Sequence, residues 1–325
     1  MEKKLYPLKF KPILKDKIWG GNKLRTLFGK NAGSDRTGES WELAGFEQEA
    51  SVVSNGFLAG NDLNELIEIY MGELIGDKVY EKYGSTFPLL FKLIDANDHL
   101  SIQVHPDDET ALRRHGSLGK TEMWYVVDAE PDAELIVGFK TDTSKEEYLT
   151  ALDNGRLNEL LRRVAVQKGD VIFIPAGLVH AIGKGIVVAE IQETSDLTYR
   201  IYDYERTDEN GNQRELHTEL ALDVIDFGAT KNPKTNYHAT LNRVTELIKC
   251  PFFTTNIIRF DKKITMNYVS LDSFVVYMCI EGSFSITVGN EKTAIAKGDT
   301  VLVPASVHEP ELVPEKECTL LEIYV

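Results

Sequence analysis

The stretch KGDVIFIPAGLVH at Lys168–His180 occurs again as KGDTVLVPASVH at Lys297–His308, one residue shorter. Both copies contain Lys-Gly-Asp, an alternating apolar segment, Pro-Ala and a final histidine in the same order. Alternating apolar residues are typical of a strand with one buried face, and proline ends a central strand because it cannot donate to the ladder. The repeat therefore predicts two similar β units rather than one large sheet.

Much of the remaining chain also has the composition of short strands. Segments rich in β-branched and aromatic residues lie between Gly, Pro, Asn or Asp, and they include SIQVH, MWYVVDA, ELIVGF, IVVAEIQE, TNIIRF, SFVVYMCIEG and SFSITVG. Helical spacing of apolar residues indicates helices within Asp62–Gly84, Thr143–Val164 and Glu215–Phe227. We expect a mainly β protein of two small jelly-roll barrels, with helical insertions in its N-terminal half.

The boundary between the two barrels is expected in the polar segment Gly228–Thr240. This placement gives an N-terminal domain of residues 1–235, which contains the helical insertions, and a C-terminal domain of residues 236–325. The segment is not a Gly/Ser-rich linker, so we expect the two domains to pack firmly against each other.

Composition excludes several classes of partner. The chain has 325 residues, 42% of them hydrophobic, and 36 Lys and Arg against 51 Asp and Glu give a net charge of −15. This charge disfavours nucleic acid and anionic membrane surfaces. The start, MEKKLYPLKF, has no apolar signal region, and apolar runs such as Phe274–Ile280 are too short to span a membrane. We expect a cytoplasmic protein, in which Cys250, Cys279 and Cys318 are buried thiols without a CxxC metal or disulfide pattern.

The first copy of the repeat, with its G-x5-P-x-G-x2-H spacing, resembles a conserved motif of the cupin superfamily, whose small barrels carry a metal. Cupins usually supply a His-x-His pair from an earlier strand, and here Gln103-Val104-His105 occupies that place. In an extended chain Ser101, Gln103 and His105 share one face, and so do Lys120 and Glu122 in LGKTEMW. Together with His180, these residues offer a mixed nitrogen and oxygen shell that suits zinc and other divalent ions.

The chain as a whole resembles the type I mannose-6-phosphate isomerase family (phosphomannose isomerases), in its short bacterial form. The resemblance rests on IWGG, GESWELAG, PLLFKLIDA, LSIQVHP, GKTEMW, PAGLVHAI and ETSDLTYR, in that order. It implies a zinc-dependent conversion of mannose 6-phosphate to fructose 6-phosphate, with one zinc ion held by Gln103, His105, Glu122 and His180. It also implies a substrate site lined by Lys92, Ser101, Lys120, Glu190, Asp196 and Arg200.

The chemistry of an aldose–ketose isomerase gives these residue types separate tasks. A proton moves between C1 and C2 through an enediol, so the site needs a base and a positive charge beside the developing oxyanion. A nearby divalent cation disfavours the ammonium form of a lysine, which makes Lys120 a candidate base, with Glu190 as its competitor. Arg200 is expected to supply positive charge, and Asp196 either to orient Arg200 or to assist ring opening.

The phosphate is expected to bind Ser101 and Lys92, because Ser101 shares the face of the ligands and lysine serves as a point-charge phosphate binder. Two departures from longer relatives bear on this expectation. Ile182 stands where those enzymes commonly have a tyrosine, and the segment after Arg200 lacks the lysine that contacts phosphate in them.

The second copy of the repeat ends in His308 but has no QxH or HxH pair upstream, so we expect the C-terminal barrel to be metal-free. Two other functions remain open at this stage. One is a non-catalytic cupin that binds a sugar phosphate or a metal, and the other is an iron-dependent cupin dioxygenase, against which the Gln103 ligand argues. The expected partner is a small sugar phosphate, and the chain is expected to be a monomer or a homodimer.

Overall fold

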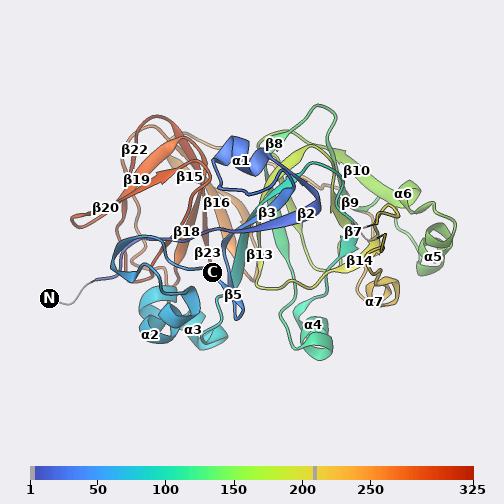
Figure 1. The fold of residues 1–325 in the computed structure, drawn as a ribbon, viewed down its shortest axis with the longest axis horizontal. Helices are drawn as coiled ribbons and strands as arrows, with labels where there is room; N and C mark the ends of the chain where they lie inside the picture. The colour runs from blue at the N-terminus through green and yellow to red at the C-terminus, as the bar shows by residue number, and fades with distance from the viewer. Residues whose placement is uncertain (1–3, 208–210) are drawn as a thin grey trace.

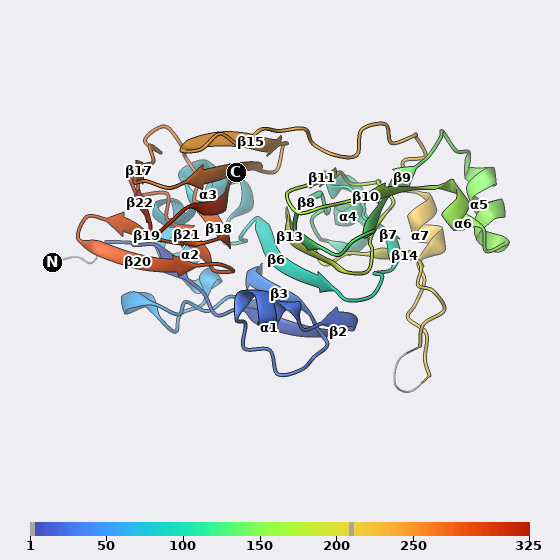
Figure 2. The same ribbon diagram turned by 90° about the horizontal axis from the view of Figure 1, so that it is seen from above.

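The computed structural model describes residues 4–207 and 211–325, and the chain is mainly β, as predicted. Its strands form two units that lie side by side, each built from one large and one smaller sheet (Figures 1 and 2). The first unit comes from the N-terminal two thirds of the chain and the second mostly from the C-terminal third, coloured orange to red in Figure 1.

The large sheet of the first unit has the order β11-β8-β13-β6-β3-β2, and the smaller sheet has the order β10-β9-β12-β7-β14. Their apolar faces meet in a core to which Val126 and Val188 contribute from the large sheet and Val137 and Ile182 from the smaller one. The bounds are β2 Ile13–Gly21, β3 Thr37–Leu43, β6 Leu89–Ala96, β7 Ile102–Val104, β8 Glu122–Ala129, β9 Glu134–Phe139, β10 Leu161–Ala165, β11 Val171–Ile174, β12 His180–Ile182, β13 Ile186–Glu193 and β14 Tyr199–Tyr202.

The second unit repeats this arrangement with the sheet orders β1-β21-β18-β23-β16-β15 and β17-β22-β19-β20. Ile258 and Tyr277 from the large sheet meet Phe284 and Leu312 from the smaller one in its core. The bounds are β1 Leu8–Lys9, β15 Arg243–Lys249, β16 Thr254–Phe260, β17 Ile264–Thr265, β18 Val275–Glu281, β19 Ser283–Val288, β20 Glu291–Ala296, β21 Thr300–Val303, β22 Glu311–Pro314 and β23 Cys318–Tyr324, with a separate ribbon of β4 Gly45–Phe46 and β5 Glu49–Ala50.

The sequence repeat corresponds to equivalent strands. Its first copy contains β11, which pairs with β8, and its second copy contains β21, which pairs with β18. Ile172 lies opposite Trp124 in the first pair, and Val301, its counterpart in the repeat, lies opposite Tyr277 in the second. The two copies of the repeat therefore lie in matching strand pairs of the two units, which is consistent with the predicted pair of barrels.

The two large sheets pack against each other through their outer faces. Leu93 and Ala189 of the first unit share one buried cluster with Val276 and Leu321 of the second. This apolar layer holds the units together and fixes the large sheet of the first unit from behind.

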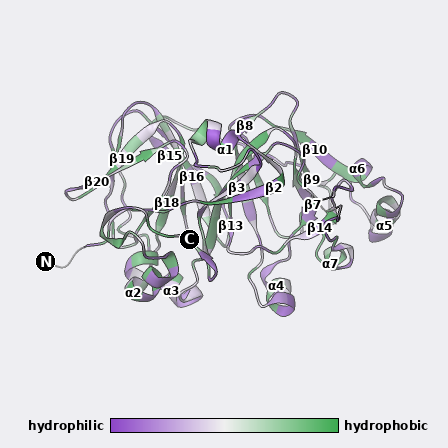
Figure 3. Cartoon of the chain, in the orientation of Figure 1, coloured by the Kyte–Doolittle hydropathy of each residue, from purple (hydrophilic) through white to green (hydrophobic). Residues whose placement is uncertain are grey.

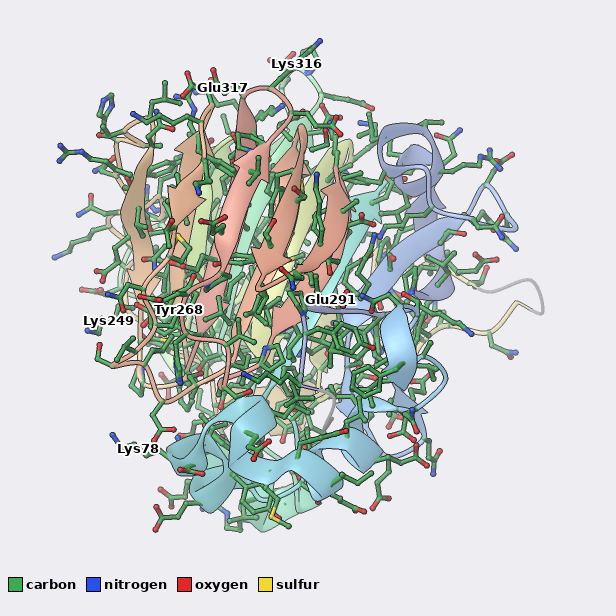
Figure 4. All side chains as sticks on the ribbon, turned by 90° about the vertical axis from the view of Figure 1, so that its left-hand side faces the viewer. Lys78, Lys249, Tyr268, Glu291, Lys316 and Glu317 are labelled. Atoms are coloured by element: carbon green, nitrogen blue, oxygen red, sulfur yellow. The ribbon has the colours of Figure 1, made fainter. Side chains whose placement is uncertain are left out.

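Segments from early in the chain also join the second unit. Strand β1 pairs with β21, and the backbone amides of Ala305 and Ser306 donate to carbonyls of Leu74 and Glu73 in α2. Figure 4 views the molecule from the side of the second unit and shows Lys78 of α3 at the opposite end from the loop of Lys316 and Glu317. The domain boundary at residue 235 stays a prediction.

The described helices lie in the N-terminal half of the chain, as predicted, except for α7, and their bounds differ from the sequence prediction. Within Asp62–Gly84 the chain breaks at Gly76, which has a positive φ of 97°. The end of Thr143–Val164 was wrongly predicted as helix, because β10 pairs with β9 from Leu161 onward. The bounds are α1 Lys23–Phe28, η1 Gly56–Leu58, α2 Leu63–Ile75, α3 Asp77–Tyr83, α4 Asp108–His115, α5 Lys145–Asp153, α6 Leu157–Leu160 and α7 Thr218–Leu222.

Hydropathy follows this architecture. In Figure 3 the central strands are largely hydrophobic, whereas α4 and the ends of the strands carry polar residues. None of the helices in the described ranges is long and apolar enough to cross a membrane.

Candidate metal centre and substrate site

Three buried side chains from different strands converge inside the first unit. His105 follows β7, Glu122 is the first residue of β8 and His180 is the first residue of β12. Their ligand atoms all lie within 4.8 Å of one another. Since β12 pairs with β7, with His180 opposite Gln103, the strand register itself brings the two imidazoles together.

The hydrogen bonds of the two histidines identify the nitrogens that face the centre. Nδ1 of His105 donates to the carbonyl of Leu197, and Nδ1 of His180 donates to the carbonyl of Leu178, both at 2.8 Å. A neutral imidazole with a proton on Nδ1 has its lone pair on Nε2. The two Nε2 atoms lie 3.1 Å apart, so two lone pairs point at the same small volume. A bound cation removes this repulsion, and a backbone partner on the other nitrogen is the usual arrangement of a metal-binding histidine.

Glu122 supplies negative charge to the same volume. Its two oxygens lie 3.4 Å from Nε2 of His180 and 3.5 Å from Nε2 of His105. The carboxylate is fully buried, and neither oxygen has a hydrogen-bond partner within the described part of the chain. A buried carboxylate without such partners is costly, which fits a position reserved for a cation.

Burial controls the protonation of this group. It lowers the pKa of His180 to about 4 and the pKa of His105 well below its ordinary value, with the nearby charge of Lys120 adding to the effect at both rings. Burial, followed by the charge of Glu190, raises the pKa of Glu122. Both imidazoles are thus neutral at pH 7, as metal ligands must be.

Gln103 and Ser101 lie beside this triad. The amide Nε2 of Gln103 is 3.3 Å from Nε2 of His180, and its Oε1 accepts a hydrogen bond of 3.4 Å from Ser101 Oγ. In this orientation the amide nitrogen faces the centre, and a half turn of the side chain is needed to present the oxygen as a ligand. Gln103 is therefore adjacent to the centre, and its role as a fourth ligand stays a prediction.

Lys120 contacts two members of the triad. Its Nζ lies 3.2 Å from Nε2 of His105 and 3.2 Å from an oxygen of Glu122. The side chain is only 5% exposed, so this ammonium group balances the carboxylate from inside the site.

Glu190 is the centre of a second buried network next to the triad. Its Oε1 pairs with Nζ of Lys92 at 3.0 Å, and its Oε2 accepts a hydrogen bond of 2.8 Å from the indole of Trp124. Gln192 also accepts from Lys92, at 2.7 Å, and its own amide donates to the carbonyls of Glu193 and Ser195. Every polar group of this network has a partner.

Charges in and around this network lower the pKa of Glu190 and raise the pKa of Lys92. Burial alone would raise the pKa of Glu190, but the ammonium groups of Lys92 and Lys120 lower it to about 2. Burial alone would lower the pKa of Lys92, but Glu190, Glu39 and Asp196 raise it above its ordinary value. Glu190 and Lys92 therefore form an ionised pair at neutral pH.

The remaining two predicted residues lie at the edge of the site. Arg200 is opposite Gln103 in the pairing of β14 with β7, and its Nη1 donates to the carbonyl of Glu215 at 2.8 Å. Asp196 is exposed, and its charge acts on Lys92. No hydrogen bond or ion pair joins Asp196 to Arg200 among the described residues, so the orienting role predicted for Asp196 is without support in this arrangement.

Sequence reasoning missed Trp124 and Gln192. Each lies two residues from a predicted site residue, Trp124 after Glu122 and Gln192 after Glu190, so each shares its face of the strand. Alternation along these two strands was a signal that could have found both.

The second unit lacks the ligand set. Val275 stands at the position of Glu122. Val275 pairs with Val303 and Glu122 pairs with Ile174, and these two partners are equivalent residues of the repeat. His308, the counterpart of His180, is exposed, and the metal-free state of this unit stays a prediction.

Comparison with known proteins agrees with this architecture. Residues 7–142 match a family model described as phosphomannose isomerase type I, catalytic domain. Residues 243–324 match one described as mannose-6-phosphate isomerase, cupin domain.

Similar proteins cover nearly the whole chain. The chain is 41% identical to the mannose-6-phosphate isomerase ManA of Bacillus subtilis, over 96% of this chain and 97% of that protein. It is 39% identical to a mannose-6-phosphate isomerase of Streptococcus mutans, over 93% of each. A crystal structure of the mannose 6-phosphate isomerase from Bacillus subtilis superposes with a TM-score of 0.89 and 34% identity, over 99% of this chain and 100% of that one. The chain therefore belongs to the type I mannose-6-phosphate isomerase family.

Proposed function

We propose that the chain interconverts mannose 6-phosphate and fructose 6-phosphate with one zinc ion held by His105, Glu122, His180 and, after rotation of its amide, Gln103. The observation that carries the proposal is the buried triad, next to the Lys92–Glu190 pair. In it two Nε2 lone pairs converge beside a carboxylate whose oxygens accept no hydrogen bond among the described residues. Two neutral imidazoles and a carboxylate are a donor set that zinc accepts. Bound there, the ion would supply a Lewis acid beside the sugar oxygens at C1 and C2.

The base that moves the proton between C1 and C2 is Lys120 or Glu190, and the geometry favours Lys120. Both oxygens of Glu190 already have partners, and its pKa is lowered to about 2, far from the neutral value that suits a general base. Lys120 acts in this role once it has lost its proton.

The charges around the reacting carbons are also assigned by this proposal. Arg200 stabilises the negative charge of the enediol from the edge strand β14, while Lys92 keeps Glu190 ionised. Ser101 and Lys92 are the proposed phosphate contacts, and Asp196 assists opening of the sugar ring.

A coupled assay of fructose 6-phosphate formation tests the function. The purified chain is assayed before treatment with a chelator, after it, and after zinc is added back. Activity that is lost and then restored supports the proposal, whereas full activity in verified metal-free protein, or no activity in zinc-loaded protein, contradicts it.

The two candidate bases are separated by exchange of the C2 proton with deuterated solvent. Lys120→Met is expected to abolish exchange, and Glu190→Gln to retain part of it. The reverse result would assign the base to Glu190.

A further inference from the structure

Three arginines gather around one buried carboxylate at the edge of the site. Asp203 is 5% exposed, and its Oδ1 accepts a hydrogen bond of 2.5 Å from Nη2 of Arg206 and another of 2.5 Å from Nη2 of Arg214. Its Oδ2 accepts from Nε of Arg214 at 2.7 Å. Arg200 belongs to the same group, because burial and the neighbouring charge of Arg214 lower its pKa. The Nε of Arg200 is buried and has no hydrogen-bond partner among the described residues.

This cluster is held in place by an unusual turn. The amide of Arg206 donates to the carbonyl of Asp203, and the two residues between them, Tyr204 and Glu205, have positive φ values of 56° and 55°. Glycine or asparagine normally occupies such positions, so two larger side chains there carry strain that surrounding contacts must offset. One such contact is the Tyr204 ring, which packs 5.3 Å from the guanidinium of Arg206. The turn therefore fixes Arg206 against Asp203.

The cluster lies beside the segment that contains Ser101 and leads into β7. Nη1 of Arg206 donates to the carbonyl of His99 at 2.6 Å, and Arg200 is opposite Gln103 on the outer strand β14 (Figure 2). Ser101 lies midway between His99 and Gln103, with its hydroxyl on the face of the metal triad. Arg206 thus contacts the backbone two residues before Ser101, and Arg200 lies opposite the residue two positions after it.

Within residues 4–207 and 211–325, the charges of the three arginines exceed the charge of Asp203. In the same ranges Asp98, at 3.9 Å from Arg206, and Glu215, beside Arg200, also act on the cluster, but both are exposed to solvent and therefore screened. Asp203 is the one buried carboxylate bonded to these guanidinium groups within the described residues. A guanidinium has five N–H donors, and the bonds to Asp203 use two of those of Arg214.

Lys92, the other proposed phosphate contact, is not free to hold the phosphate alone. Its ammonium is held by Glu190 and Gln192, and its charge already balances a buried carboxylate. The planar fork of arginine, by contrast, matches the geometry of a phosphate group.

We propose that Arg214 and Arg206, positioned by Asp203, form with Ser101 the phosphate subsite, in place of the lysine that this chain lacks. The inference rests on the proposed function, because it names the residues that recognise the phosphate of that substrate. Arg214 contacts the phosphate, and Arg206 and Asp203 act mainly as positioning residues.

The test uses the zinc-loaded full chain with Arg214→Met, and Arg259→Met as a matched control. Arg259 is an exposed arginine of the second unit that pairs with Glu317. In Arg214→Met the KM for mannose 6-phosphate and the inhibition constant for inorganic phosphate are expected to rise together, by about 10- to 100-fold, as for lost hydrogen bonds to a charged group. Because phosphate binding is the same in ground and transition states, kcat is expected to stay within a few-fold.

Zinc content, the melting temperature and calorimetric binding of inorganic phosphate accompany the kinetics. Arg214→Lys is expected to fold and to recover part of the phosphate affinity. A purely structural role of Arg214 does not predict this recovery. Unchanged KM and phosphate affinity in a folded Arg214→Met variant of an active enzyme overturn the subsite. A different result would overturn only the proposed function. In that case the wild-type chain binds phosphate but does not isomerise mannose 6-phosphate, and Arg214→Met loses the phosphate binding.

Discussion

Replacing Lys92 by methionine should destabilise the protein strongly, because it leaves the carboxylate of Glu190 without its ion partner. Lys92 is 4% exposed and Glu190 is 3% exposed, and the pair spans 3.0 Å. Removing one partner of a buried ion pair costs about 3–5 kcal/mol, since the other charge stays behind. The Trp124 hydrogen bond remains and limits the loss.

The pH dependence of this effect has a definite sign. In the wild type the pKa of Glu190 is lowered to about 2, so the pair stabilises the fold above the unfolded pKa near 4.5, and this contribution is lost as pH falls towards 2. In Lys92→Met only Lys120 and the Trp124 hydrogen bond still oppose the effect of burial, so the pKa of Glu190 should rise from its wild-type value. The variant therefore loses stability as pH rises, so the gap to wild type should be widest near pH 7 and should narrow towards pH 4.

Thermal unfolding of the chelated proteins, followed between pH 4 and pH 8, measures the gap. The double variant Lys92→Met/Glu190→Gln is the control, because it removes both charges and should recover much of the lost stability. A gap below about 1 kcal/mol at pH 7, or one that does not change with pH, would show that the two side chains do not form an ionised buried pair.

Three further predictions concern other parts of the structure. His180→Ala should lose bound zinc, whereas His308→Ala should keep it, and metal analysis of both proteins decides whether the repeat binds metal only once. Trp124→Phe removes the hydrogen bond to Glu190 and should lower kcat by about tenfold at unchanged zinc content; a wild-type kcat would show that Trp124 does not position Glu190. Burial raises the pKa of Glu322, so protonated Glu322 stabilises the fold at low pH and this contribution decreases as pH rises. Glu322→Gln should therefore weaken the pH dependence of the melting temperature between pH 5 and pH 9, and an unaltered slope would assign that dependence to other groups.

The mainly β character of the chain and the triad could be predicted because their signals are local. The alternation in SIQVH and the repeated KGD and PA motifs specify which residues face inward, and register then brings His105, Glu122 and His180 together. The family resemblance named the same residues and placed Lys120 in the substrate site.

Pairings between strands far apart in the sequence were harder to predict. Lys92 and Glu190 come from β6 and β13, and only the register shows that they neutralise each other. The same register reveals a matching group in the second unit. Glu322 lies opposite Asn256 on one neighbouring strand and opposite Tyr277 on the other. Glu190 lies between Lys92 and Trp124 in the same way, so the three residues of the second unit occupy the corresponding places.

Local composition did not predict one strand and one turn correctly. The segment Leu161–Ala165 follows two short helices and contains helix-favouring residues, yet its pairing with β9 makes it a strand. The cluster at Asp203 depends on a turn that contains neither glycine nor asparagine at its two central positions, so its sequence gives no turn signal.

We propose that one metal ion in the buried triad supports the isomerase activity, and a zinc titration tests this directly. Zinc is titrated into chelated protein while the conversion of mannose 6-phosphate is followed, and Glu122→Gln is titrated in parallel. Wild-type activity should rise linearly and stop rising at one zinc per chain, and the variant should show no such break. Wild-type activity that needs no zinc would contradict this proposal. So would equal activities of Glu122→Gln and wild type at one equivalent of zinc per chain.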